Sequence, residues 1–153
     1  MSEDPTRRDM LARIDASWDA FRAAVKVRRG QGFDATTHSG WTVRAVLAHV
    51  GAWHDATADR LRRFAATGRG QPKVEADDDV FNARVAAETA DRRDDQVVAD
   101  LDRSFARFRA AVGELPGFSA NDDGWVEAVV AGNSYEHYTE HLDELRAAAP
   151  ADA

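Results

Sequence analysis

The chain has 153 residues, of which 44% are hydrophobic and 31% are charged, so its length suits one globular domain, residues 1–153, and leaves no room for a second full core. The formal net charge of −7 and the pI of about 5.2 argue against a general nucleic-acid binder, and the absence of cysteine excludes disulfides, cysteine–zinc sites and a thiol nucleophile. No apolar run approaches the roughly 20 residues of a membrane span, and the first ten residues lack the apolar core of a signal peptide, which predicts a cytoplasmic protein.

Two long amphipathic helices are predicted in the first half of the chain. Within residues 6–29, apolar side chains recur at steps of three and four, which places them on one helix face: Leu11, Ile14, Trp18, Phe21 and Val25. The second helix begins sharply at Thr42, because a threonine hydroxyl can cap the free N–H groups of a first turn. Gly68 and Gly70 end this helix.

A long polar connection follows. Residues 71–93 are acidic and contain Pro72 and three consecutive aspartates at 77–79, and a short helix is predicted over residues 80–89. A connection of this length usually serves as a lid, or as a crossover between helices that are not neighbours in an up-and-down bundle.

The second half of the chain predicts two more helices. The third covers residues 94–115 and stops at the Pro-Gly dipeptide 116–117, and the fourth covers residues 123–148. We find no convincing strand. The sequence therefore predicts an all-α fold, a four-helix bundle with one long crossover between helices 2 and 3, and we expect residues 1–5 and 149–153 to be frayed.

Two histidines four residues apart mark the last helix. His137 and His141 lie about 40° apart on one helix face, at the spacing with which two imidazoles can bind one metal ion. Their face is mostly apolar and points toward the bundle core; it also carries Val126, Val130, Ser134 and Leu145. The same spacing is compatible with hydrogen-bonded core histidines, since buried imidazoles need partners of some kind.

A metal site would need a third ligand from another helix. The second helix offers two candidates, His49 at the edge of its apolar stripe and His54 near the centre. Periodicity prefers His54 but does not decide, because it leaves the rotation and depth of the helices open. His38, in a loop, is the weakest candidate.

Two segments carry a family resemblance. WTVRAVLAHVGAW (41–53) and NSYEHYTEHLDEL (133–145) resemble the DinB/YfiT-like superfamily of four-helix bundles, including the N-terminal domain of mycothiol-dependent maleylpyruvate isomerase and the ClbS/DfsB proteins. The resemblance spans roughly residues 7–145 and implies an up-down-down-up helix order. It also implies that His49, His137 and His141 bind a metal, with His54 near the site or against the core. ClbS/DfsB relatives tend to lack this triad, whereas this chain has all three histidines. The resemblance therefore favours the metal-binding members of the superfamily.

Such a triad implies particular chemistry. Three imidazoles without a thiolate suit a divalent metal, zinc or nickel first and iron or manganese next, and three protein ligands leave a position open, as in catalytic sites. The candidate pocket residues are His54, Trp53, Asn133 and Tyr138. The alternative is a core or packing role for His54, Trp53 and Tyr138, and capping of a neighbouring turn for Asn133. The following charged side chains are expected mainly on solvated faces, although the arginines can also attract an anionic substrate: Glu136, Glu140, Arg60, Arg62 and Arg63.

Three hypotheses for function follow. The first is a metal-dependent enzyme that acts on a small electrophilic substrate, either as a hydrolase or as an S-transferase or isomerase using a low-molecular-weight thiol of the mycothiol or bacillithiol type. The second is a ClbS-like protein that binds a small molecule, or confers self-resistance to one, without a catalytic metal. The third is a bundle with buried, hydrogen-bonded histidines and a dimer interface as its main feature. In each case we expect a homodimer and no nucleic-acid or membrane partner.

Overall fold

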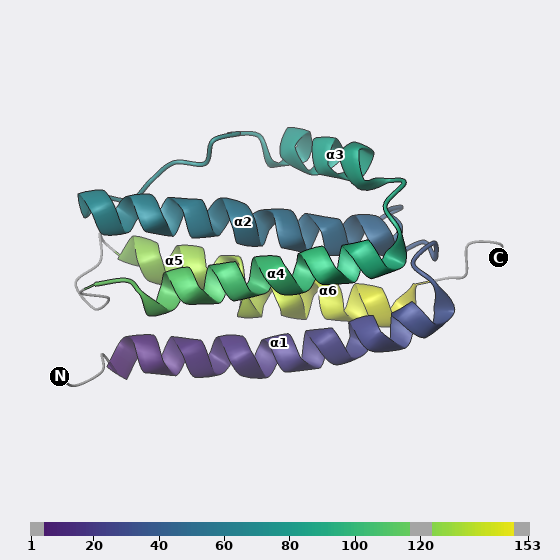
Figure 1. Cartoon of the computed structure of the whole chain (residues 1–153), viewed down its shortest axis with the longest axis horizontal. Coiled ribbons are helices and arrows are strands. Elements are labelled where there is room, and N and C mark those ends of the chain that lie inside the picture. Colours follow the sequence, from purple (N-terminus) through teal and green to yellow (C-terminus); the bar gives the residue numbers. More distant parts are fainter. Residues whose placement is uncertain (1–4, 117–123, 149–153) are drawn as a thin grey trace.

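The computed structural model describes residues 5–116 and 124–148, and these form six helices and no strand. The helices are α1 (Pro5–Gln31), α2 (Val43–Thr67), α3 (Asp78–Thr89), α4 (Asp94–Gly113), α5 (Trp125–Gly132) and α6 (Tyr135–Ala147) (Figure 1). A single isolated bridge joins Thr36 to Thr42 in the loop before α2. None of the described helices has the length and hydropathy needed to cross a membrane.

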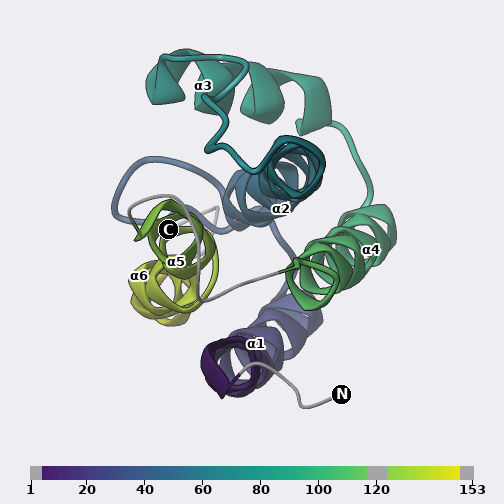
Figure 2. The same cartoon turned by 90° about the vertical axis from the view of Figure 1, so that its left-hand side faces the viewer.

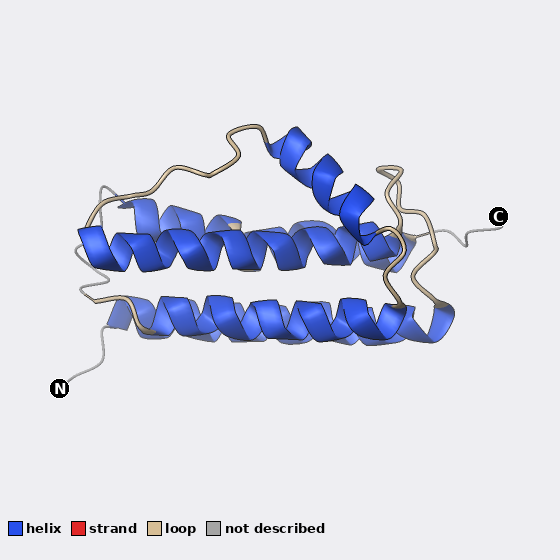
Figure 3. Cartoon of the chain, turned by 45° about the horizontal axis from the view of Figure 1, so that its top comes forward, coloured by secondary structure: helices blue, strands red, loops and turns tan. Residues whose placement is uncertain are grey.

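The helices form the all-α bundle that the sequence predicts. Figure 1 shows α1 running in one direction, α2 and α4 both running in the opposite direction, and α5 and α6 returning along the bundle. Viewed end-on in Figure 2, α1, α2, α4 and the α5–α6 pair occupy the four corners, and α3 lies outside them against α2. Two parallel neighbours need a long connection, and the segment from 68 to 93, which contains α3, supplies it (Figure 3).

Side-chain caps set the ends of the helices around this crossover. Thr42 caps α2 by accepting a hydrogen bond from the Ala45 amide at 3.1 Å, and Gly68 closes the helix in the left-handed region at φ 73°. Helix α3 begins at Asp78, two residues earlier than the sequence predicts. The reason is that the Asp77 carboxylate accepts hydrogen bonds from the amides of Asp79 and Val80.

The predicted continuous fourth helix is wrong, because α5 and α6 are separated at Asn133 and Ser134. Both side chains bond to carbonyls of the preceding turn: Asn133 Nδ2 donates to Val129 O at 2.8 Å, and Ser134 Oγ donates to Val130 O at 2.5 Å. Polar side chains that bond to nearby backbone compete with regular helix, which accounts for the break. The predicted start at residue 123, like residues 1–4 and 149–153, lies outside the described residues.

The core has two apolar clusters that meet beside His54. The first includes Trp18, Phe21, Leu47, Leu101 and Leu145, and the second includes Ile14, Leu61, Phe108, Val126 and Val130. The imidazole of His54 is fully buried and lies against the rings of Trp18, Phe105 and Phe108. A polar group thus occupies the centre of the bundle, and it needs hydrogen-bond partners there.

Those partners come from two other helices. Ser104 Oγ donates its proton to Leu101 O at 2.8 Å, so it accepts from His54 Nδ1, which lies 3.0 Å away. His54 Nε2 is then unprotonated and accepts from the Tyr138 hydroxyl at 2.5 Å. This chain of bonds joins α2, α4 and α6 and fixes the rotation of α6 relative to α2.

Replacing Tyr138 with phenylalanine is expected to lower the free energy of unfolding by about 1–3 kcal/mol, because the buried Nε2 of His54 loses its donor. Urea titration of the purified variant measures this loss. Tyr135→Phe, at a half-buried position of the same helix, is the matched control and should cost less. Equal stability of the two variants would show that the buried network contributes nothing.

Candidate metal centre

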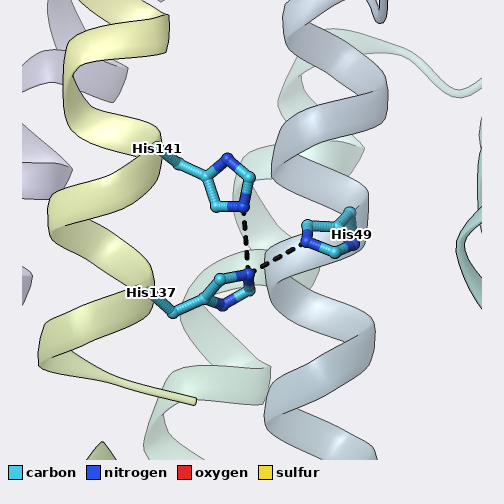
Figure 4. A group of neighbouring side chains, drawn as sticks. All are labelled: His49, His137 and His141. Atoms are coloured by element: carbon cyan, nitrogen blue, oxygen red, sulfur yellow. Dashed lines mark hydrogen bonds between the residues drawn. The ribbon is translucent and has the colours of Figure 1, made fainter. Parts of the chain in front are cut away.

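Three imidazoles from two helices converge at one point of the bundle. His49 comes from α2, and His137 and His141 come from successive turns of α6 (Figure 4). Nε2 of His137 lies 2.9 Å from Nε2 of His49 and 3.0 Å from Nε2 of His141. The structure therefore brings together the three histidines that the family resemblance implies.

The competing candidates lie elsewhere. Periodicity preferred His54, and the structure corrects that preference: five residues separate His54 from His49, which turns it by about 140° around α2 and into the core. His38 is exposed in the loop before α2. Hydrophobic periodicity misled here because a histidine at the centre of an apolar stripe is a core residue, whereas a ligand belongs at the edge of a cleft.

The three nitrogens are close enough together to bind one divalent ion. Two nitrogens that each lie about 2.0–2.1 Å from a tetrahedral ion are about 3.3–3.4 Å apart; the two separations from His137 Nε2 are 2.9 and 3.0 Å, and all three ligand atoms lie within 4.8 Å of one another. Nδ1 of His137 has no hydrogen-bond partner among the described residues, whereas its Nε2 lies within hydrogen-bond distance of Nε2 of both other histidines. Three unprotonated nitrogens in this arrangement would offer three lone pairs to one cation.

Burial keeps two of these imidazoles neutral. It lowers the pKa of His137 to about 2, an effect reinforced by the neighbouring His141 and His49. It also lowers the pKa of His49 to about 4, together with His141, while Asn82 and Asp78 act in the opposite direction. Since metals bind the neutral form of imidazole, no proton competes with a metal at these two ligands near pH 7.

Two residues beside the triad were missed by sequence reasoning. Asn82 Oδ1, on α3, lies 2.8 Å from His49 Nδ1, and Glu144 Oε1 lies 3.4 Å from His141 Nδ1, within ion-pair distance but without hydrogen-bond geometry. Glu144 could have been found, because it follows His141 by three residues on the same helix. Asn82 could not, because its contact depends on how α3 docks against α2.

The triad lies in a cleft of about 790 Å³, a volume typical of small-molecule sites. The cleft is lined by residues of α2, α3 and α6, of the segments before α2 and α3, and of the α5–α6 junction. These include Trp41, Val46, Trp53, Asn82, Asn133, Glu140 and Glu144. Of the four predicted pocket residues, Trp53 and Asn133 line the cleft. His54 and Tyr138 do not, because their mutual hydrogen bond holds both in the core.

One of the three arginines considered above faces this cleft. Arg60 lines it, donates from Nε to Gln71 O at 3.0 Å, and lies over the Trp125 ring, 5.3 Å from its centroid. Burial and the nearby Arg63 lower its pKa, against the opposing effect of Asp78. Within the described part of the chain Arg60 has no salt bridge, whereas Arg62 pairs with Glu114 at 3.3 Å outside the cleft.

These features define a helical-bundle protein with a histidine-lined cleft. The sequence matches the family described as the mycothiol maleylpyruvate isomerase N-terminal domain over residues 11–127, more than three quarters of the chain. The chain belongs to this family, and through it to the DinB/YfiT-like helical superfamily. The match includes His49 and ends before His137 and His141. No curated protein and no solved structure matches the sequence.

Acid is expected to destabilise the metal-free protein well above the pH at which carboxylates titrate. Burial lowers the pKa of His54 to about 3, whereas its pKa in the unfolded chain is 6.5. Above pH 6.5 the imidazole is neutral in both states; as the pH falls from 6.5 toward 3, only the unfolded state takes up the proton, and the free energy of unfolding therefore falls. Between pH 6.5 and 5.5 the loss is about 1 kcal/mol for each such histidine, and His49 and His137 behave alike.

Urea unfolding in the presence of a chelator at pH 8.5, 7.5, 6.5 and 5.5 measures this dependence. The two highest pH values serve as the internal control, because the histidines are neutral there in both states and the free energy of unfolding should stay nearly constant. A free energy that is equally constant from pH 7.5 to 5.5 would contradict the neutral, buried state of these imidazoles.

Proposed function

We propose that this protein is a divalent-metal-dependent enzyme in which Nε2 atoms of His49, His137 and His141 hold the ion. The observation that carries the proposal is the convergence of these three nitrogens, two of them on imidazoles kept neutral by burial, in a cleft large enough for a small molecule. We further propose that the reaction is the transfer of a thiol to a small electrophile, or an isomerisation through such a thiol, in keeping with the family's name.

The donor set narrows the choice of metal. Three imidazole nitrogens and no thiolate suit zinc or nickel first, and iron or manganese next. A bound ion of this kind would supply Lewis acidity toward a thiol, a water molecule or a carbonyl group at its open position. Because the chain contains no cysteine, the thiol would come from a low-molecular-weight co-substrate.

The chain's own residues would bind and orient the reactants. Glu144, only 7% exposed, lies beside Nδ1 of His141 and would hold that imidazole in place while offsetting the charge of the ion. The apolar faces of Trp41, Val46 and Trp53 line the same cleft and would exclude water from the reacting groups.

Arg60 indicates the class of substrate. It follows His49 by eleven residues, which places the two on nearly the same face of α2 about 16 Å apart along the axis. Its guanidinium is already oriented by Gln71 O and by the Trp125 ring, and among the described residues no carboxylate lies within salt-bridge distance, although Asp78 is near enough to act on its pKa. We propose that the substrate is elongated, with its reactive group at the histidines and a carboxylate at Arg60.

Metal analysis of protein purified without a histidine tag is expected to give about one divalent ion per chain. His137→Ala should abolish binding, because two remaining ligands make a weak site. His38→Ala, which changes an exposed histidine outside the cleft, is the control and should retain the ion. If the wild type takes up none of zinc, nickel, iron or manganese, the enzyme proposal fails and metal-free ligand binding in the cleft replaces it.

For the metal-loaded protein we expect thiol consumption with small electrophiles that carry a carboxylate. Arg60→Gln should raise KM for these substrates about 10-fold or more, with little change in kcat, because a charge-assisted hydrogen bond is lost. Arg62→Gln is the matched control. Product formation without thiol consumption would identify a hydrolase, and equal KM values for the two variants would contradict the role of Arg60.

A further inference from the structure

Helix α3 lies outside the bundle, yet it supplies a contact to the histidine triad. We propose that Asn82 of α3 is a positioning residue that holds the ring proton of His49 on Nδ1 and so keeps Nε2 free as a metal ligand. The tautomer itself is a property of the metal-free protein, and only its consequence for metal affinity rests on the proposed function.

Trp53 fixes the orientation of the Asn82 amide. Its Oδ1 lies 2.9 Å from Nε1 of Trp53. An indole N–H can only donate a hydrogen bond, so the amide atom facing it is the acceptor oxygen and not the amide nitrogen. Trp53 thereby removes the ambiguity that an asparagine side chain otherwise has between its two ends.

The same oxygen fixes the position of the ring proton of His49. Asn82 Oδ1 also lies 2.8 Å from Nδ1 of His49, and an oxygen that accepts at this distance requires a proton on that nitrogen. A neutral imidazole carries one ring proton, so Nε2 of His49 keeps its lone pair. That lone pair is directed toward Nε2 of His137, 2.9 Å away (Figure 4).

Helix α3 holds Asn82 in this position. Phe81 packs against Trp53 with ring centroids 4.4 Å apart, Val85 is buried at 8% exposure, and the Asp77 carboxylate caps the first turn. His49 is also the one triad member whose Nδ1 has a hydrogen-bond partner of good geometry among the described residues. The crossover helix therefore keeps Nε2 of His49 available as a metal ligand, in addition to covering one side of the triad.

Nitrogen NMR of histidine-labelled, metal-free protein tests the tautomer directly. In the wild type we expect His49 to be protonated on Nδ1. Asn82→Ala should populate the Nε2-protonated form, whereas Asn82→Asp, whose carboxylate accepts from both N–H groups, should restore the wild-type spectrum. Trp53→Phe should give a mixture, because the amide can then turn its nitrogen toward His49. Glu88→Gln, on the exposed face of α3, is the control and should change nothing.

Zinc titration of the same variants then measures the consequence. Asn82→Ala should weaken zinc binding about 10- to 100-fold, and Asn82→Asp should bind within a few-fold of the wild type. An Asn82→Ala protein that keeps Nδ1 protonated, or binds zinc as the wild type does, overturns the inference. A wild type that shows the expected tautomer and binds no zinc instead defeats the proposed function, and the positioning of the His49 proton by Asn82 stands.

Discussion

Enclosing imidazoles in a small helical bundle removes the water that would otherwise solvate them, so each enclosed histidine needs a compensating partner. His54 is satisfied within the core by Ser104 and Tyr138. His49 is satisfied at the cleft by Asn82 of the crossover helix. His137 has no partner for Nδ1 among the described residues, and its Nε2 faces Nε2 of His49 and of His141. One histidine, His54, is therefore a hydrogen-bonded core residue. The three histidines of the triad face a common point where a cation could bind their nitrogens.

The helices themselves were predictable because their signals are local. The apolar period of α1, the cap at Thr42 and the stop at Gly68 each act within a few residues, and all appear in the structure where the sequence places them. The break after α5 was missed because its cause, two side chains bonding back to carbonyls, competes with a helical period that continues through it. The sequence pattern alone does not show whether the side-chain bonds or the helical period prevails at these residues.

The site was predictable only in part, for a different reason. The i,i+4 pair on α6 was evident from spacing, but choosing His49 over His54 required the resemblance to known proteins, because the two differ in how α2 is rotated in the bundle. Asn82 depends on the path of the crossover back along α2, and nothing near it in the sequence encodes that path. Residues that complete a site from a separate element are the ones that sequence patterns leave out.

The external position of α3 has a consequence for how stability is distributed. This helix packs chiefly against α2, and Val85 is its one buried apolar residue. Its detachment exposes little apolar surface, so it should open at a far smaller free-energy cost than the four-cornered bundle, as a separate cooperative unit in amide hydrogen exchange. Each such opening withdraws Asn82 from His49 while His137 and His141 stay in place on α6. If the triad holds an ion as proposed, exchange of that ion would be separated from global unfolding, and its rate would depend on the opening of one short helix.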